Sequence, residues 1–298
     1  MADNIGNKAA HNYHLNEPPR EEGFPVKGAA HDDWGMKYRL SRMFRKDSGH
    51  TVMLAFDHGY IMGPTAGLER IDITIPPLIP HVDVIMGTRG IIRAAIPPAS
   101  DVALCVRATY DTTVLFDEMS NGGGIACDME NALRMDAACL AVQTFIGAPG
   151  ESRSLELLCR TADAGARYGI PTLGVVAVGK QMERTERFFQ LATRVLAENG
   201  ANVVKSYYCD GFERVAAACP VPIVIAGGKK LPELDALQMA YQAIQEGASG
   251  VDMGRNIFQS DCPEGMAEAI GKVVHEGYTA KEAYEVYETA KANQPIDF

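Results

Sequence analysis

Short apolar runs of strand length recur along the chain between residues 51 and 253. Several of the segments that separate them repeat apolar residues at helical spacing and end just before a glycine, as in 152–168, 183–199 and 234–246. Apolar strands that alternate with helices predict a parallel sheet covered by helices. The eight runs are Thr51–Phe56, Val82–Met86, Val102–Val106, Ala138–Ile146, Thr172–Val178, Asn202–Tyr207, Pro222–Ala226 and Gly250–Met253.

Eight strand-and-helix units predict a closed (β/α)8 TIM barrel, with an N-terminal extension and an extra C-terminal helix. No Gly-x-Gly-x-x-Gly motif follows the first run, which disfavours an open dinucleotide-binding sheet. Residues 32–44 predict a helix that closes the bottom of the barrel, with Trp34 as a packing residue. Residues 108–125 predict an excursion rather than a helix, and 263–276 and 280–292 predict two further helices.

The chain divides into a polar, flexible N-terminal tail over residues 1–30 and a single TIM-barrel catalytic domain over 31–298. The tail has no apolar core typical of a signal peptide, and no segment has the length of a membrane span. A net charge of -10 argues against a partner that is nucleic acid or a membrane surface. We therefore expect a cytoplasmic protein that binds an anionic substrate through a local site.

Seven cysteines lie mostly within apolar runs, and none forms a Cys-x-x-Cys pair. This pattern is typical of small core residues in a reducing compartment, so we expect neither disulfides nor a metal site.

Lys205 stands in the sixth apolar run, among valines that the pattern places in the core. Alternate residues of a strand point to opposite faces, so Val203 and Lys205 share one face. Burial without a partner lowers the pKa of a lysine, and a neutral amine forms a Schiff base with a carbonyl substrate. The alternatives are a side chain that reaches the rim or one that pairs with a carboxylate.

Glycines follow the seventh and eighth runs, where a (β/α)8 barrel commonly binds phosphate. Glycines let backbone N–H groups approach an anion closely, a helix N-terminus adds its positive end, and arginine grips the anion through paired donors. The predicted phosphate-binding residues are Gly227, Gly228, Gly254 and Arg255. The alternative is that these glycines serve only turns.

Asp57 and His58 end the first run and offer a carboxylate and an imidazole. A phosphate held after strands seven and eight places a carbonyl over Lys205, which suits a ketose phosphate or a similar phosphorylated ketone. Asp57, on the neighbouring side of the closed barrel, is then placed to move protons. The alternatives are a rim ion pair for Asp57 and a structural role for His58.

Four runs together resemble the DeoC/FbaB-type class I aldolase family, over roughly residues 34–292. They are AFDHG (55–59), VVKSYY (203–208), PVPIVIAGGKK (220–230) and GVDMGRNIFQS (250–260). The runs DWGM, VMLAFDHGY, GPT-x-GLERID and DMGRNIFQSD are similar to one branch in particular, which degrades autoinducer-2.

The resemblance implies Schiff-base chemistry at Lys205 and phosphate binding by the four residues after strands seven and eight. For the autoinducer-2 branch it implies cleavage of 3-hydroxy-2,4-pentanedione 5-phosphate, with transfer of the acetyl group to coenzyme A as co-substrate. The products are dihydroxyacetone phosphate and acetyl-CoA, and no cofactor is bound covalently. It also implies a cytoplasmic homo-oligomer, with a ring-based decamer as the family expectation.

One departure from the family bears on the reaction. Val178 stands where the fructose-bisphosphate aldolase and aminodeoxyheptulosonate synthase relatives have a catalytic tyrosine. Valine cannot shuttle a proton, whereas the second carbonyl of a β-dione stabilises the carbanion without that tyrosine. Lys180, Lys229 and Lys230 are candidates for the phosphates of coenzyme A, with a solvated rim as the alternative. No cysteine, Cys209 included, has the surroundings of a thiolase nucleophile.

Three other functions stay open on the sequence alone. The first is a class I fructose-bisphosphate aldolase or an aminodeoxyheptulosonate synthase. The second is a phosphosugar isomerase or epimerase that uses Asp57 and His58 as acid and base, with Lys205 as an electrostatic group. The third is a non-catalytic phosphosugar-binding barrel, which has no need of a buried amine.

Overall fold

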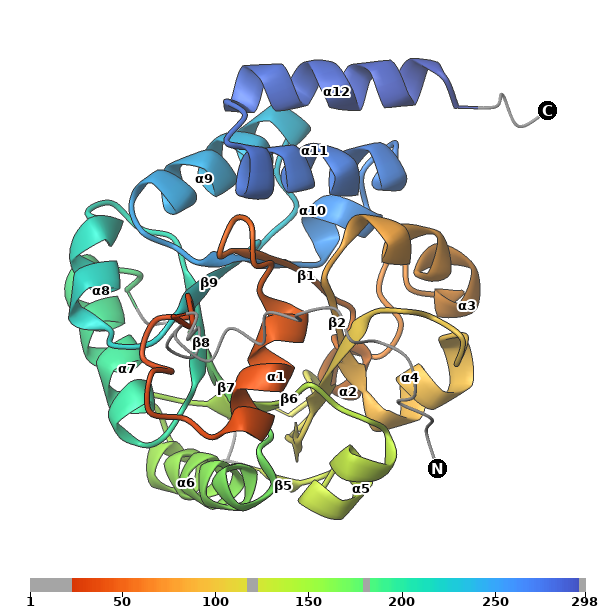
Figure 1. The fold of residues 1–298 in the computed structure, drawn as a ribbon. Helices are drawn as coiled ribbons and strands as arrows, with labels where there is room; N and C mark the ends of the chain where they lie inside the picture. The colour runs from red at the N-terminus through yellow and green to blue at the C-terminus, as the bar shows by residue number, and fades with distance from the viewer. Residues whose placement is uncertain (1–22, 117–122, 179–182, 295–298) are drawn as a thin grey trace, which may run out of the picture.

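Eight parallel strands close into a barrel in the order β1-β10-β9-β8-β7-β6-β3-β2 within the part of the chain that the structure describes (Figure 1). The structure is a computed structural model, and it describes residues 23–116, 123–178 and 183–294. The predicted (β/α)8 barrel and its eight runs are confirmed. The strands are β1 Thr51–Ala55, β2 Val84–Thr88, β3 Ala103–Arg107, β6 Cys139–Thr144, β7 Thr172–Val176, β8 Val203–Tyr207, β9 Ile223–Ala226 and β10 Gly250–Met253.

Helices surround the barrel, as Figure 1 shows. They are α1 Trp34–Met43, α2 Gly59–Met62, α3 Ile71–Thr74, the 3-10 helix η1 Pro76–His81, α4 Arg89–Ala95, α5 Met129–Arg134, α6 Glu151–Tyr168, α7 Glu186–Glu198, α8 Phe212–Ala218, α9 Glu233–Gln245, α10 Arg255–Phe258, α11 Pro263–Glu276 and α12 Ala280–Ala292. None of these described helices is both long and apolar enough to cross a membrane. The predicted C-terminal helices are α11 and α12, which pack against each other and against α9.

The strands alternate their side chains between two hydrophobic clusters. Met53, Val84 and Val203 belong to the cluster that fills the barrel, whereas Val52 and Val204 belong to the cluster between strands and helices. Because Lys205 is two residues after Val203, its side chain points into the barrel. This confirms the predicted face of the strand.

Helix α1 covers the end of the barrel at which the strands begin. Its Met36, Leu40 and Met43 are buried in the cluster that fills the barrel, which confirms the predicted closing helix. The predicted packing role of Trp34 is wrong: this residue is 77% exposed and stacks on the half-exposed Tyr38, with ring centroids 5.0 Å apart. Trp34 is two positions before Met36 and therefore lies about 200° around the helix from it.

The predicted flexible tail extends too far along the chain. Residues 1–22 lie outside the described residues, but 23–30 are described and pack under the barrel. Val26 and Ala29 are buried there, and the Nζ of Lys27 donates a hydrogen bond of 2.8 Å to the carbonyl of Ala216. Two short apolar side chains therefore anchor a segment whose composition is otherwise typical of a loop.

The predicted excursion after β3 contains a small antiparallel pair, β4 Thr109–Tyr110 and β5 Gly124–Ile125. Residues 117–122, between these two strands, lie outside the described part of the chain. The pair lies at the end of the barrel where the strands terminate, since β4 follows β3 directly.

Candidate active site

Lys205 lies inside the barrel, and its side chain is only 12% exposed. Its Nζ is 2.8 Å from Oδ2 of Asp252 on β10, and 3.9 Å from the sulfur of Met86 on β2. The side chain therefore does not reach the rim. The predicted lysine without a partner is not observed, because Lys205 pairs with a carboxylate, which was the alternative.

Asp252 is the part of this pair that sequence reasoning missed. Its side chain is 0% exposed and forms an ion pair with Lys205; among the described residues no other group donates a hydrogen bond to its oxygens. Burial raises the pKa of Asp252, and the positive charge of Lys205 opposes that shift only in part. The available signal was the alternation of β10, because Val251 and Met253 face the helices and Asp252 must then face the barrel interior.

Asp57 follows β1 and forms a buried ion pair with Arg107 at the end of β3. The Nε and Nη2 atoms of Arg107 donate to Oδ2 of Asp57 at 2.8 and 2.5 Å, and its Nη1 donates to Gln143 at 3.1 Å. Burial acts to raise the pKa of Asp57, but Arg107, followed by Lys205 and His58, outweighs it and holds this pKa below its usual range. Asp57 is therefore an ionised carboxylate near neutral pH.

His58 stands beside Asp57 and makes an edge contact with Phe258, with ring centroids 5.9 Å apart. Burial lowers the pKa of His58; Asp57 opposes this shift, while Lys205 and Arg255 add to it. The ring is therefore neutral near pH 7. Its buried Nδ1 has no hydrogen-bond partner among the described residues, so that nitrogen remains able to bind a ligand or a proton.

The glycine turns, formed by Gly227 and Gly228 after β9 and by Gly254 and Arg255 after β10, follow neighbouring strands. Gly228 has a left-handed backbone with φ of 67°. A Cβ on Gly254 would strike the carbonyl oxygen of Ala55 and would come within 2.8 Å of the His58 ring. The structure thus brings all four predicted phosphate-binding residues together, next to the strand that carries Lys205.

Asn256, a second residue that sequence reasoning missed, joins the two glycine turns. Its Nδ2 donates to the carbonyl of Gly227, and its Oδ1 accepts from the N–H of Leu231, both at 2.8 Å. Asn256 is fully buried, and this fixed pairing holds the loop after β9 against the helix start after β10. The buried Nε of Arg255 has no partner among the described residues, which leaves a donor for an anion.

Arg184 adds a cation that the sequence did not single out. Its guanidinium lies 4.3 Å from the centroid of the Tyr207 ring, and its Nη1 is 3.9 Å from where a Cβ on Gly228 would be. Of the lysines proposed for coenzyme A, Lys230 pairs with Glu233 at 2.7 Å, Lys229 is exposed, and Lys180 lies outside the described residues.

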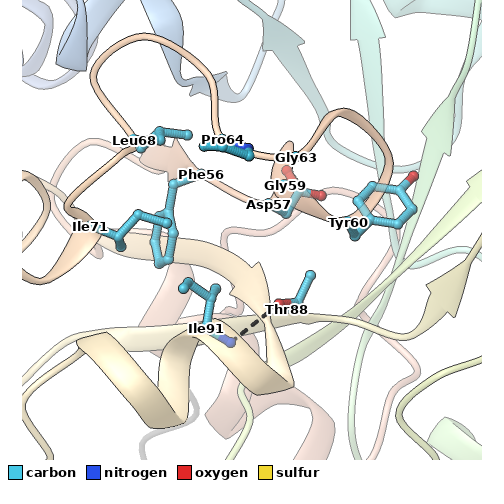
Figure 2. Close-up of a pocket in the computed structure, with 10 residues that line it drawn as sticks. All are labelled: Phe56, Asp57, Gly59, Tyr60, Gly63, Pro64, Leu68, Ile71, Thr88 and Ile91. Carbon is cyan, nitrogen blue, oxygen red and sulfur yellow. Dashed lines mark hydrogen bonds between the residues drawn. The ribbon is translucent and has the colours of Figure 1, made fainter. Parts of the chain in front are cut away.

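A pocket of about 400 Å³ opens beside these groups, and we call it the β1–β2 pocket (Figure 2). Its apolar wall comes from Phe56, Leu68, Ile71 and Ile91, and Asp57, Tyr60 and Thr88 line it as well. Lys205 and the glycine turns do not line it. Because Asp57 belongs to its wall and acts electrostatically on Lys205, the pocket borders the site without containing the lysine.

The cysteines offer no reactive thiol near Lys205. All seven are free, and Cys209 belongs to the cluster between strands and helices rather than to the barrel interior. Cys209 therefore points away from Lys205, although the two residues are close in sequence. Burial, with Glu186 next in effect, raises the pKa of Cys209 to about 11, so its thiol stays protonated at neutral pH. The described residues also hold no group of three His, Cys, Asp or Glu side chains that could bind a metal ion.

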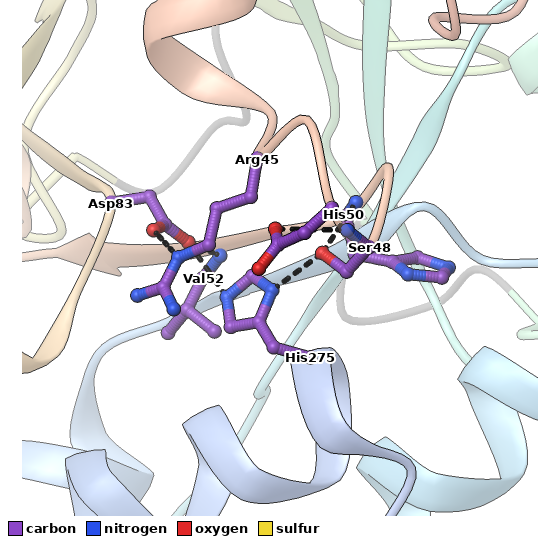
Figure 3. A network of polar contacts seen from close by, with 7 residues as sticks. Arg45, Ser48, His50, Val52, Asp83 and His275 are labelled. Atoms are coloured by element: carbon purple, nitrogen blue, oxygen red, sulfur yellow. Dashed lines mark hydrogen bonds and ion pairs between the residues drawn. The ribbon is translucent and has the colours of Figure 1, made fainter.

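A second polar cluster lies at the opposite end of the barrel, where β1 and β2 begin (Figure 3). Asp83 accepts from the N–H of Val52 at 2.7 Å and from Arg45 at 2.5 Å, and it contacts His275 at 2.9 Å. The other nitrogen of His275 is 2.8 Å from the hydroxyl of Ser48. Because Asp83 is bonded by groups from several elements, we assign this cluster to stability.

A (β/α)8 barrel with a buried lysine next to two glycine turns is an arrangement that suits an aldolase-type enzyme. Residues 51–260 match the model of the DeoC/LacD family aldolases. The chain belongs to this family.

Two relatives are 51% identical to the chain over 292 residues, which is 98% of this chain and the whole of each relative. One is from Photorhabdus laumondii and the other from Escherichia coli K12, and both are named 3-hydroxy-5-phosphonooxypentane-2,4-dione thiolase.

Solved structures agree with the fold. An archaeal fructose 1,6-bisphosphate aldolase matches at a TM-score of 0.72 and 24% identity, over 81% of this chain and 100% of its own. The fructose-bisphosphate aldolase from Slackia heliotrinireducens matches at a TM-score of 0.75 and 21% identity, over 94% of this chain and 99% of its own.

Proposed function

We propose that this protein cleaves 3-hydroxy-2,4-pentanedione 5-phosphate through a Schiff base on Lys205 and transfers the acetyl group to coenzyme A. The products are dihydroxyacetone phosphate and acetyl-CoA. The observation on which this rests is the buried Lys205–Asp252 pair next to the glycine turns. The names of the two 51% identical relatives support the choice of substrate.

The substrate phosphate binds the glycine turns in this proposal. Backbone N–H groups at Gly227 and Gly228 and the free Nε of Arg255 are the donors, and Arg184 adds charge at the rim. The phosphate is on C5, so its binding directs the neighbouring C4 carbonyl toward β8 and Lys205. A phosphorylated substrate is thereby oriented before any bond is made.

Asp252 and Asp57 have different roles in the next step, proton transfer for Asp252 and charge stabilisation for Asp57. Asp252, whose pKa is raised, accepts a proton from the ammonium of Lys205, and the resulting amine attacks C4. Loss of water gives an iminium cation. Asp57 is held ionised by Arg107, which makes it a weak base, so we assign it to stabilising the iminium charge instead of the predicted proton movement.

Cleavage breaks the bond between C2 and C3. The thiol of coenzyme A attacks the C2 carbonyl, and the bonding electrons move into the iminium to give an enamine and acetyl-CoA. The thiol proton passes to the neutral His58 and from there to C3. Hydrolysis of the C4 iminium returns the water and releases dihydroxyacetone phosphate. Since the C4 iminium stabilises the electrons and C2 is already a carbonyl, no tyrosine at position 178 is required.

We expect a cytoplasmic homo-oligomer, with the decamer as the specific expectation. Its support is a set of large apolar side chains left exposed in the single chain: Trp34, Val114, Leu115 and Phe116. The seven free thiols suit a reducing compartment. Sedimentation velocity measures the assembly directly, and a single monomer peak at micromolar concentration would contradict it.

A substrate panel separates the proposed function from its alternatives. Purified protein with the phosphorylated dione should form acetyl-CoA only when coenzyme A is present, and the Lys205→Met variant should form none. Release of glyceraldehyde phosphate from fructose bisphosphate would instead indicate a classical aldolase. Unchanged turnover by Lys205→Met would rule out Schiff-base chemistry.

A further inference from the structure

We infer that the β1–β2 pocket binds the pantetheine arm of coenzyme A and delivers its thiol to the substrate on Lys205. The inference rests on the proposed function, and it assigns the acceptor site that neither the sequence nor the relatives' names provide. The first reason is that the reaction needs two binding sites at once. The glycine turns serve the phosphate end of the dione, so the thiol must approach from another side of the barrel mouth.

The β1–β2 pocket lies on such a side. Around the barrel, β9 and β10 carry the glycine turns, and the next two strands are β1 and β2. Thr88, in the pocket wall, is on the same face of β2 as Met86, whose sulfur is 3.9 Å from the Nζ of Lys205. The pocket therefore meets the barrel interior at Asp57 and Thr88, while Phe56 and Leu68 of its apolar wall belong to the cluster between strands and helices.

The lining of the pocket fits an uncharged, narrow chain better than a sugar phosphate. Figure 2 shows Phe56, Ile71 and Ile91 close together, with Asp57 and Tyr60 on another side of the space. Thr88 fixes one wall, because its Oγ1 accepts a hydrogen bond from the N–H of Ile91. A volume of about 400 Å³ is within the usual range for small-molecule sites and accommodates a pantetheine arm.

Arg89 supplies the charge that the diphosphate of coenzyme A requires. It lines a smaller pocket of about 190 Å³ that shares Tyr60 and Thr88 with the β1–β2 pocket. Arg89 is exposed, and its charge acts on Asp128 and Cys127 across the start of α5. With the pantetheine arm in the apolar pocket, the diphosphate of coenzyme A therefore lies near Arg89 at the rim.

Two matched pairs of variants test the inference. Ile71→Trp fills the pocket, and Ile73→Trp places the same bulk on the same helix at a position that is 58% exposed. Arg89→Ala removes the rim cation, and Arg93→Ala removes an exposed arginine one turn further along α4. The measurements are the KM for coenzyme A and the yield of borohydride-trapped dione on Lys205 without coenzyme A.

We expect Ile71→Trp and Arg89→Ala to raise the KM for coenzyme A by about tenfold or more, while dione trapping and both control variants stay at the wild-type level. An unchanged KM in Arg89→Ala overturns the inference, also if Ile71→Trp fails to fold. Loss of trapping in Ile71→Trp, with Ile73→Trp normal, overturns it as well, because the pocket would then bind the dione. A wild-type protein that traps no dione at all would instead overturn the proposed function itself.

Discussion

Among single residues, Asp252 gives the clearest prediction for the reaction rate. Replacing it by asparagine keeps the shape of the side chain but removes the proton acceptor for Lys205. We expect Asp252→Asn to lower kcat by about 10²–10⁴-fold, the usual range for a lost acid–base group. Steady-state kinetics with the phosphorylated dione measures this change.

The pH profile separates this role from a structural one. Burial raises the pKa of Asp252, so in the wild type kcat/KM should fall with decreasing pH at a pH above the usual carboxylate value of about 4. Asp252→Asn should lose that acid limb. Ser206→Ala, on the other face of β8, removes a buried hydroxyl with no partner among the described residues and is a suitable control. An acid limb that persists in Asp252→Asn would contradict the role.

At this scale the sequence predicted the residues at strand ends and missed their partners. Lys205 and the glycines stand out because of their type and position within an apolar run. Asp252 and Arg107 do not, because the contacts that define them cross 47 to 50 positions of sequence. Only closure of the barrel brings such residues together, so the ion pairs of Lys205 and Asp57 could not be predicted from the sequence.

Arg107 links elements that do not pair with each other, since β2 separates β1 from β3. Arg107→Met would leave the carboxylate of Asp57 buried without its ion partner. We expect a loss of about 3–5 kcal/mol in the free energy of unfolding, measured by urea denaturation. Adding Asp57→Asn to that variant should recover part of the loss, and a double variant no more stable than the single one would contradict this account.

Asn256 links the two glycine turns, and its removal should disturb phosphate binding more than chemistry. We expect Asn256→Ala to raise the KM for the phosphorylated dione about tenfold with a smaller change in kcat, because both hydrogen bonds that hold the loop after β9 to the turn after β10 are lost. Asn256→Asp keeps the acceptor for Leu231 and should show a smaller effect. An equal change in KM for an unphosphorylated dione would show that the phosphate site is not involved.

Helices and strands could be predicted from the sequence where the repeat of apolar residues is long enough to be recognised. The eight strands and the long helices α6, α7 and α9 agree with the pattern to within a few residues. The seven-residue helices α4 and α8 were not predicted, because two turns contain too few apolar repeats. The packing of the segment before α1 was not predicted for a related reason. Its two buried residues, Val26 and Ala29, stand among polar residues, a composition typical of a loop.

At the scale of the whole molecule, two partly buried groups on the side away from the active site make stability depend on pH. Burial lowers the pKa of His50, with His275 next in effect, so the folded state resists protonation there. For Asp83, burial acts to raise the pKa, but the bonds from His275, Val52 and Arg45 outweigh it and hold the pKa low. Both shifts favour the folded state at neutral pH over acid pH.

We therefore expect the melting temperature to fall in two steps. His50 costs stability as pH drops below about 6.5, where the unfolded chain binds a proton first. The contribution of Asp83 is complete above about pH 4 and is lost as pH falls through its lower folded pKa. Asp83→Asn should lower the melting temperature at pH 7 and flatten the second step. A profile identical to that of the wild type would contradict this assignment.

The chemistry proposed at Lys205 depends on one geometry: an amine inside the barrel, next to the two glycine turns. Sodium borohydride tests it most directly, since it reduces an iminium to a stable amine. After incubation with the phosphorylated dione and borohydride, mass spectrometry should find the adduct on the peptide that contains Lys205, and on no other lysine. An unmodified Lys205 peptide from protein that still turns over the dione would contradict the account.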